Sequence, residues 1–215
     1  MDRLAKRTLE RFGAVHLVCN NAGVGAGGPL WTLSREDWSW VLGVNLWGVI
    51  HGIRAFVPHL VAQDAGHVVN TASLAGLLAP PGMGPYNATK HAVVAISETL
   101  HGDLNLAGSA VGVSVLCPGF VRTQIFEADR NRPAHAPRPE STPEEQALRD
   151  RMKSQLLAGA MEPDEVAART VDAVREGRLW IFTHPETRPA VEARMRGILE
   201  ERAPDAPGLD PGRAW

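Results

Sequence analysis

The chain has 215 residues, of which 44% are hydrophobic and 21% are charged. This is enough apolar material for one sizeable core, so a single domain is expected. Its 22 basic side chains against 24 acidic ones leave a formal net charge of -2. Such a balance gives no general attraction to a phosphate backbone or an anionic membrane. We therefore expect neither nucleic acid nor a membrane as a partner.

The N-terminal stretch MDRLAKRTLERFG predicts an amphipathic helix that ends at Gly13. Its charges exclude a secretory signal, because such a signal has an apolar central region. We also expect that no apolar run reaches the length of a membrane-spanning helix.

Three short apolar runs predict buried strands, and a fourth is a weaker candidate. They are AVHLVC from Ala14, HVVNTAS from His67, VGVSVLC from Val111 and, more weakly, RLWIFTH from Arg178. Their hydrophobic residues do not alternate cleanly with polar ones, which is typical of parallel strands covered on both faces.

Long helical patterns separate these strands, and they cover residues 34–63, 86–108 and 163–177. The first begins at Ser34, with Asp37 three residues later, and the last begins at Pro163. Alternating strands and helices predict an α/β fold with a doubly wound parallel sheet between two helical layers. We expect this domain to cover residues 1–202, followed by a disordered tail at 203–215.

The segment 129–146 is rich in proline and charge and has no apolar period, which predicts a long mobile loop. It follows the third strand, where a lid over a site would lie, and a plain surface excursion is an equal alternative. Cys19 and Cys117 each lie in an apolar run and are expected in the core. With one strand between them, their thiols would lie roughly 9 to 10 Å apart, too far for a disulfide. Reduced thiols favour a cytoplasmic location.

Polar and turn-forming residues follow the strands, at Asn20, Thr71 and Pro118 and just beyond. In an open parallel sheet, ligands bind beyond the carboxyl ends of the strands, so we expect the site there. Tyr86, the only tyrosine, precedes Lys90 by four residues. About 400° of helical rotation separates them, which places both on one face of a helix.

A plain interpretation of this pair is a ring packed under an aliphatic stem. A chemical interpretation is that the phenol, with a free pKa of about 10, acts as a general acid or base with Lys90 as the nearby cation. Ser73 could donate a hydrogen bond to a substrate oxygen.

Five motifs together resemble those of short-chain dehydrogenases/reductases. They are NNAG from Asn20, VNLWG around Asn45, TAS ending at Ser73, YNATK from Tyr86 to Lys90, and CPGFVRT from Cys117. The resemblance spans residues 1 to about 125, with a looser match to the end. It implies a Rossmann-like fold and an oxidoreductase that transfers a hydride between NAD or NADP and a secondary alcohol or ketone.

The resemblance also implies roles for single residues. Tyr86 would exchange a proton with the substrate oxygen, and Lys90 would lower the pKa of Tyr86 and bind the nicotinamide ribose. Ser73 would orient the substrate oxygen, and Asn45 would hold a water in a proton relay to Lys90. The residues implied near the cofactor are Asn21, Ala22, Gly23, Tyr86, Lys90, Pro118, Gly119, Val121 and Thr123. Plainer alternatives are a buried structural amide for Asn45 and backbone caps for Ser73 and Thr123.

Members of this family open with a strand, a glycine-rich turn, a helix and two further strands, whereas this chain starts within the helix before NNAG. The resemblance therefore implies an N-terminally truncated fold without the pyrophosphate turn. We expect either that the natural protein is longer or that a partner covers the edge of the first strand. GVGAGG at 23–28 matches a dinucleotide pattern, but Pro29 follows and no helix is signalled before Ser34. A flexible loop near the substrate is the favoured interpretation.

The family commonly dimerises through its two long helices, so a homo-oligomer is expected. A rival hypothesis is a catalytically silent subunit that pairs with a complete relative. A hydrolase is disfavoured because no GxSxG elbow is present, and a metal site is disfavoured because no ligand spacing such as HExxH occurs. An apolar group between Ser73 and Tyr86 suggests a wall for a hydrophobic substrate, although core packing explains it equally well. Its members are Leu77, Leu78, Pro80, Pro81 and Met83, and Trp31 can add to them.

Overall fold

The computed structural model describes residues 1–134, 136 and 142–204. These residues fall into two compact units, one up to residue 183 and one from residue 184, and each is described by itself. Most of the tail predicted at 203–215 lies outside the described residues. The second unit contains a short 3-10 turn η5, Pro185–Thr187, followed by helix α7, Arg188–Leu199.

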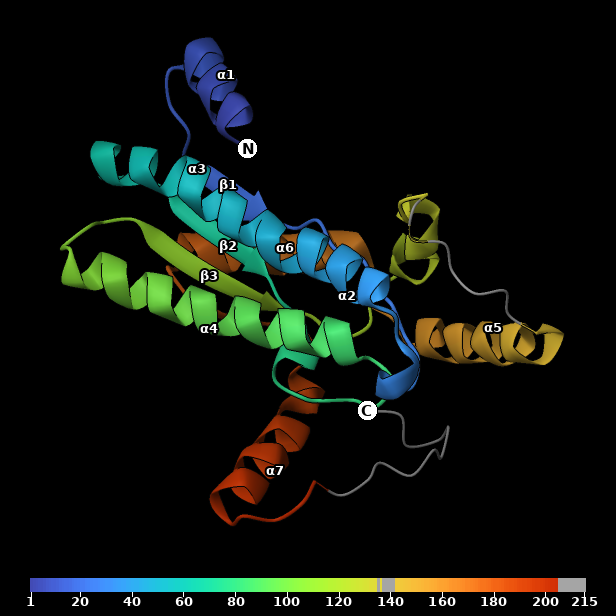
Figure 1. Cartoon of the computed structure of the whole chain (residues 1–215). Helices are drawn as coiled ribbons and strands as arrows, with labels where there is room; N and C mark the ends of the chain where they lie inside the picture. Colours follow the sequence, from blue (N-terminus) through green and yellow to red (C-terminus); the bar gives the residue numbers. More distant parts are fainter. Residues whose placement is uncertain (135, 137–141, 205–215) are drawn as a thin grey trace. The chain divides into compact units, whose positions relative to one another are not determined.

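The first unit contains one parallel sheet of four strands in the order β1-β2-β3-β4 (Figure 1). The strands are β1 Leu17–Asn20, β2 His67–Thr71, β3 Gly112–Cys117 and β4 Trp180–Phe182. All four predicted strands are therefore confirmed, each shorter than its apolar run. Cys19 pairs with Val69, and Val69 pairs with Ser114, which fixes the register across the first three strands.

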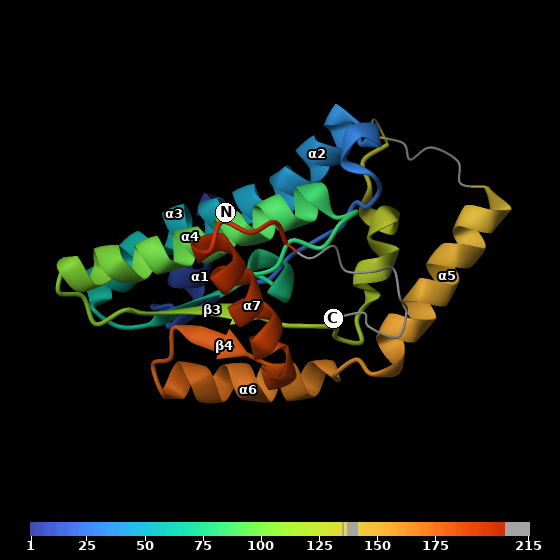
Figure 2. The same cartoon turned by 90° about the horizontal axis from the view of Figure 1, so that it is seen from below.

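Helices cover both faces of this sheet, as the alternating pattern predicts. The helices described in this unit are α1 Asp2–Phe12, α2 Arg35–Val41, a π-helical turn η2 Leu42–Leu46, α3 Trp47–Gln63, α4 Gly84–Leu106, α5 Pro143–Ala158 and α6 Pro163–Arg175. Short 3-10 turns are η1 Leu30–Thr32, η3 Leu74–Gly76 and η4 Gln124–Asn131. In Figure 2, α3 and α4 lie on one side of the sheet and α6 on the other. The predicted three-layer α/β fold is confirmed.

The predicted helix boundaries follow from local hydrogen bonds. The Asp37 amide donates to Ser34 Oγ at 3.1 Å and the Ser34 amide donates to Asp37 Oδ2 at 2.9 Å, which completes the capping box. Gly13 ends α1 in the left-handed region, with φ of 78°. Pro163 occupies the first position of α6.

The continuous helical segment Arg35–Gln63 is long and apolar enough to cross a membrane, by length and composition alone. The expectation that no such segment exists is therefore wrong. About half of its apolar window, 44%, is buried within the protein. Val49, Phe56 and Leu60 are buried in this helix, so packing against the sheet accounts for part of its apolar composition.

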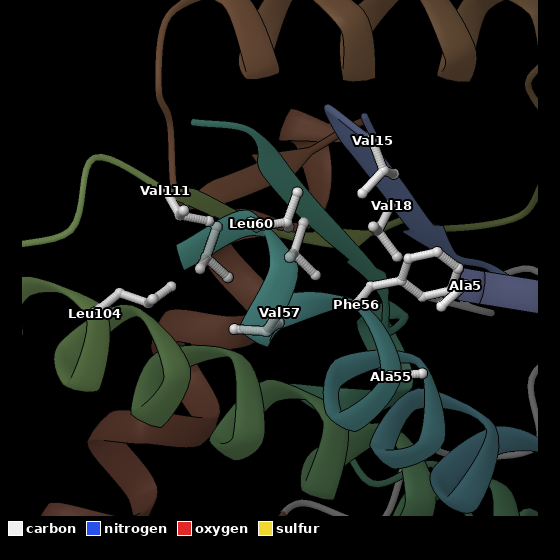
Figure 3. Close-up of a cluster of buried hydrophobic side chains, with 11 residues drawn as sticks. Ala5, Val15, Val18, Ala55, Phe56, Val57, Leu60, Leu104 and Val111 are labelled. Carbon is white, nitrogen blue, oxygen red and sulfur yellow. The ribbon is translucent and has the colours of Figure 1, made fainter. Parts of the chain in front are cut away.

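The main core lies between the sheet and the face covered by α3 and α4. Val18, Phe56 and Leu60 pack there with Val68 and Val113 from the central strands (Figure 3). On the opposite face, α6 packs on β3 and β4 through a second apolar cluster. Its buried members are Val69, Leu116, Val166, Ala173 and Ile181.

Among the residues that the structure describes, strand β1 is covered on one face only, unlike the central strands. Its residues alternate in burial, with Val18 buried and Leu17 and Cys19 exposed. Helix α6 contacts β3 and β4, so the corresponding face of β1 remains open. The prediction that both cysteines lie in the core is therefore wrong for Cys19 and correct for Cys117, and both thiols are free.

The segment 129–146 begins and ends in helical structure, so the loop predicted there is shorter than expected, and its mobility stays a prediction. Its first residues belong to η4 and its last to α5, while residues 135 and 137–141 lie outside the described part of the chain. Arg132 anchors it, because Nη1 bonds to Asp37 Oδ1 at 2.6 Å and Nε bonds to Asp129 Oδ1 at 3.0 Å. Its guanidinium also lies 4.5 Å from the centre of the Trp40 ring.

A buried amide pair joins β1 to β2 and makes Gly52 of α3 sensitive to substitution. Asn20 Nδ2 donates to Asn70 Oδ1 at 2.8 Å, and a Cβ at Gly52 would overlap the Asn20 amide. We expect Gly52→Ala to lower the free energy of unfolding by about 3 kcal/mol, because overpacking also breaks a buried hydrogen bond.

Gly48→Ala is the matched control in the same helix, because a Cβ there meets no atom within 4 Å. It should change stability by less than about 1 kcal/mol, in the stabilising direction. Urea denaturation at equal protein concentration measures both variants. Equal effects would show that the Asn20 contact does not constrain α3.

Candidate active site

The carboxyl ends of three strands meet at one edge of the sheet, as predicted. Thr71, the last residue of β2, donates from Oγ1 to Asn21 Oδ1 at 3.0 Å just beyond β1. The Leu74 amide donates to the Pro118 carbonyl at 2.9 Å, which joins the end of β2 to the end of β3. Polar groups from three distant parts of the sequence thus lie together.

Helix α4 brings Tyr86 and Lys90 to this edge. Tyr86 is half-buried and Lys90 is 3% exposed, and Lys90 Nζ lies 5.5 Å from the centre of the Tyr86 ring. Lys90 Nζ donates to the Thr71 carbonyl at 2.8 Å. The predicted placement of both side chains on one helix face is therefore observed, and the ammonium, not only the aliphatic stem, lies near the ring.

Burial shifts the pKa values of both groups toward their neutral forms. It lowers the pKa of Lys90 from 10.5 to about 8, and the nearby Cys117 opposes that change. Burial raises the pKa of Tyr86, and a hydrogen bond with the Ser73 side chain opposes the rise. In the chain by itself, Tyr86 thus carries its proton at neutral pH while Lys90 remains mostly charged.

Asn45 lies in the π-helical turn that interrupts the helix 35–63. Its Oδ1 accepts from the Val24 amide at 2.8 Å, and its Nδ2 donates to the Val24 carbonyl at 2.9 Å and to Thr89 Oγ1 at 3.3 Å. This is the structural amide that was the plainer alternative. The water relay stays a prediction, although Gly23 lies beside both groups: a Cβ there would be 3.6 Å from Asn45 Oδ1 and 3.7 Å from Lys90 Nζ.

Ser73 and Thr123 both cap short 3-10 turns. Ser73 Oγ accepts from the Ala75 amide at 3.1 Å, and Thr123 Oγ1 accepts from the Ile125 amide at 3.4 Å. A cap uses a lone pair of the hydroxyl oxygen and leaves its proton available. Ser73 can therefore cap η3 and still donate to a ligand beside Tyr86.

The residues implied for the cofactor divide into two groups. Asn21, Ala22 and Gly23 follow β1, and Pro118 and Gly119 follow β3 at the same edge of the sheet. Val121 lies further along the chain and forms an isolated β-bridge with Met161, which lies just before α6. A long segment of the chain connects these two residues. Figure 1 shows the described parts of this segment, with η4 and α5, beyond the carboxyl ends of the strands.

The glycine stretch at 23–28 does not open a helix, in agreement with its interpretation as a loop. Instead the Gly28 amide donates to the Gly82 carbonyl at 2.9 Å, and Gly28 forms a parallel bridge with Met83. Two contacts near Tyr86 were not predicted. One is the Thr71 carbonyl that holds Lys90, and the other is Asn87, whose Nδ2 donates to the Pro80 carbonyl at 2.7 Å. A backbone carbonyl carries no residue signature, so the first could not have been found from the sequence.

Comparisons with known proteins agree on one family. A family model described as short chain dehydrogenase matches residues 1–134. The CLA biosynthesis dehydrogenase/reductase of Lactiplantibacillus plantarum is 32% identical over 98% of this chain and 75% of its own length. The C alpha-dehydrogenase of a Sphingobium species is 33% identical over 94% of this chain and 66% of its own length. The chain thus spans about two thirds to three quarters of these relatives.

Solved structures are similar as well. A short chain dehydrogenase/reductase from Burkholderia phymatum, in complex with NAD, is 48% identical with a TM-score of 0.89, and the match covers 95% of this chain and 73% of the other. A putative short-chain dehydrogenase from Novosphingobium aromaticivorans is 37% identical with a TM-score of 0.72, covering 97% and 67%.

The buried ammonium makes a prediction about stability. Because folding lowers the pKa of Lys90 to about 8 from 10.5, its charge destabilises the folded state below pH 8. This cost fades as the pH rises from about 8 toward 10.5, where the side chain is neutral in both states. We expect Lys90→Met to raise the free energy of unfolding near neutral pH by about 1 to 2 kcal/mol, after the loss of the bond to Thr71 is subtracted.

Urea denaturation of the variant and the native chain across this pH range measures the difference, which should shrink above pH 8. Lys6→Met is the control, since the Lys6 side chain is 77% exposed and should show no such trend. A Lys90→Met variant that is less stable at every pH would contradict the assigned burial cost.

Proposed function

Because the chain belongs to the short-chain dehydrogenase family, we propose that it is an oxidoreductase that exchanges a hydride between NAD or NADP and a secondary alcohol or ketone. The observation that carries the proposal is the pairing of Tyr86 with the buried ammonium of Lys90 at the carboxyl ends of the strands. The NAD complex of the Burkholderia phymatum relative supports the choice of cofactor.

The groups around Lys90 fit the nicotinamide ribose of such a cofactor. An ammonium has three donors, and Lys90 uses one for the Thr71 carbonyl, so others can serve ribose hydroxyls. Gly23 borders the same nitrogen without a side chain. The residues that would hold the nicotinamide half are Asn21, Ala22, Gly23, Lys90, Pro118, Gly119, Val121 and Thr123. When bound, the cofactor supplies or accepts the hydride.

Tyr86 would move the proton. In ketone reduction its hydroxyl donates a proton to the carbonyl oxygen as the carbon gains a hydride, and in alcohol oxidation the phenolate takes the proton back. Lys90 stabilises the phenolate with its charge, and Ser73 donates a hydrogen bond to the same substrate oxygen. The raised pKa of Tyr86 keeps the phenol protonated at neutral pH, which is the form that reduction requires. Asn45 would complete a proton path through water to Lys90.

The substrate proposed for this site is hydrophobic. Met83, just before α4, is 36% exposed and supports this proposal, whereas Leu78 is buried and Leu77 packs against the core. A panel of ketones should show higher kcat/KM for aliphatic than for charged members. Equal use of both would contradict this part of the proposal.

We also propose a homo-oligomer formed through α3 and α4. Trp47 and Val61 of α3 expose 50% and 40% of their surface, which is apolar area that association would bury. A homo-oligomer has Tyr86 and Lys90 in every subunit and should be active by itself. A silent subunit would show no turnover without a complete relative.

Replacement of the tyrosine tests the proposed chemistry. We expect Tyr86→Phe to lower kcat for ketone reduction by about 10² to 10⁴, because the general acid is lost. The cofactor Kd, followed by energy transfer from the tryptophans to NADH, should change little. Unchanged kcat in a variant that binds cofactor normally would remove Tyr86 from the mechanism.

The pH dependence of reduction follows from Lys90. Since its pKa is about 8 in the folded chain, kcat/KM should fall as the pH rises through about 8 and the ammonium loses its proton. Lys90→Arg keeps the charge, so its profile should lack this decline whatever its absolute rate. The same decline in both proteins would assign the pH effect to another group.

A further inference from the structure

The segment Leu77–Met83, here called the wall segment, depends on hydrogen bonds to residues outside it for its shape. Pro80 and Pro81 have no amide hydrogen, so the segment cannot build a regular ladder of its own. At its start, the Leu78 amide donates to the Leu74 carbonyl at 2.7 Å. At its end, the Gly82 carbonyl accepts from the Gly28 amide at 2.9 Å.

The middle of the wall segment is held by Asn87, the residue after Tyr86. Asn87 Nδ2 donates to the Pro80 carbonyl at 2.7 Å. Asn87 Oδ1 is buried and has no hydrogen-bond partner among the described residues, so the bond to Pro80 fixes which way the amide faces. If the amide were flipped, Asn87 Oδ1 would face the Pro80 carbonyl oxygen, and two hydrogen-bond acceptors would lie together. The side chain therefore links the backbone of the wall segment to the turn of α4 that carries Tyr86.

The glycine stretch 23–28 closes the other side of this arrangement. Gly28 and Gly82 have φ of 144° and 78°, a region that favours glycine, and a Cβ at Gly27 would lie 3.2 Å from the Gly82 carbonyl. Leu30 packs directly on Gly84, where a Cβ would overlap its side chain. These glycines thus permit close contact between two loops and the start of α4.

We propose that Asn87 is a positioning residue that holds the wall segment beside Tyr86 and so sets which secondary alcohols or ketones reach the phenol. The part about substrates rests on the proposed oxidoreductase function. The part about the wall segment rests on the contacts of Asn87 alone. Asn87 acts through the backbone at Pro80, and the proton transfer remains with Tyr86.

Asn87→Asp tests the anchor without a substrate. The carboxylate has the same shape but cannot donate to the Pro80 carbonyl, so we expect amide hydrogen exchange in residues 77–83 to rise by roughly 10-fold. Asn105→Asp is the matched control, since it makes the same change at an exposed position of the same helix. Exchange in β3 should be unchanged in both variants. Unchanged exchange in the wall segment of Asn87→Asp would overturn the proposal.

At low pH the carboxyl of Asn87→Asp gains a proton and can again donate to the Pro80 carbonyl. A general structural defect in the variant would not be reversed in this way. Below the pKa of the new carboxyl, the exchange ratio of Asn87→Asp to the native chain should return toward one. Kinetics then tests the consequence: the ratio of kcat/KM for bulky against small ketones should shift by about 5-fold or more in Asn87→Asp, with the KM for NADH unchanged. Unchanged discrimination in an active enzyme would overturn the role in specificity. Absence of turnover in the native chain would contradict the proposed function, while the exchange result would still decide the anchor.

Discussion

The structure of the site depends on the burial of one charge, the Lys90 ammonium. Removing an ammonium from water is costly unless polar groups receive it, and here the Thr71 carbonyl at the end of β2 does so at 2.8 Å. That bond requires α4 to lie close to the strand ends, and Gly76 allows the approach because a Cβ there would lie 2.6 Å from the Lys90 carbonyl. Tyr86, one turn earlier in α4, is carried to the same edge.

Polar side chains at this edge of the sheet also hold the backbone in place. Ser73 caps η3 through a lone pair of its hydroxyl, and Asn45 fixes the backbone at Val24 in both directions. Such contacts hold the polar side chains still before any substrate is bound. A rigid, partly dry environment is what makes a fixed cation and a fixed hydroxyl effective in catalysis.

Local patterns made much of this fold predictable, because strands, caps and turns depend on neighbouring residues. The capping box at Ser34 and the alternation of β2, α4 and β3 are such cases. The motif around Tyr86 also indicated the edge of the sheet at which Tyr86 and Lys90 lie. Contacts between distant segments were out of reach: Arg132 bonds to Asp37 across 95 residues, and no local pattern encodes that pairing. The exposure of Cys19 depends likewise on which strands α6 covers.

Titration of Tyr86 tests the central claim, the coupling of this phenol to Lys90, most directly. Tyr86 is the only tyrosine in the chain, so the near-ultraviolet absorbance of tyrosinate reports this group alone. Lys90, with a pKa of about 8, is neutral where the phenol titrates, whereas an arginine at the same position stays charged. The account therefore predicts a pKa above 10 in the native chain and a lower value in Lys90→Arg, because a charge close to the ring favours the phenolate. The same pKa in both proteins would show that a cation at position 90 does not act on Tyr86, and would contradict the proposed mechanism.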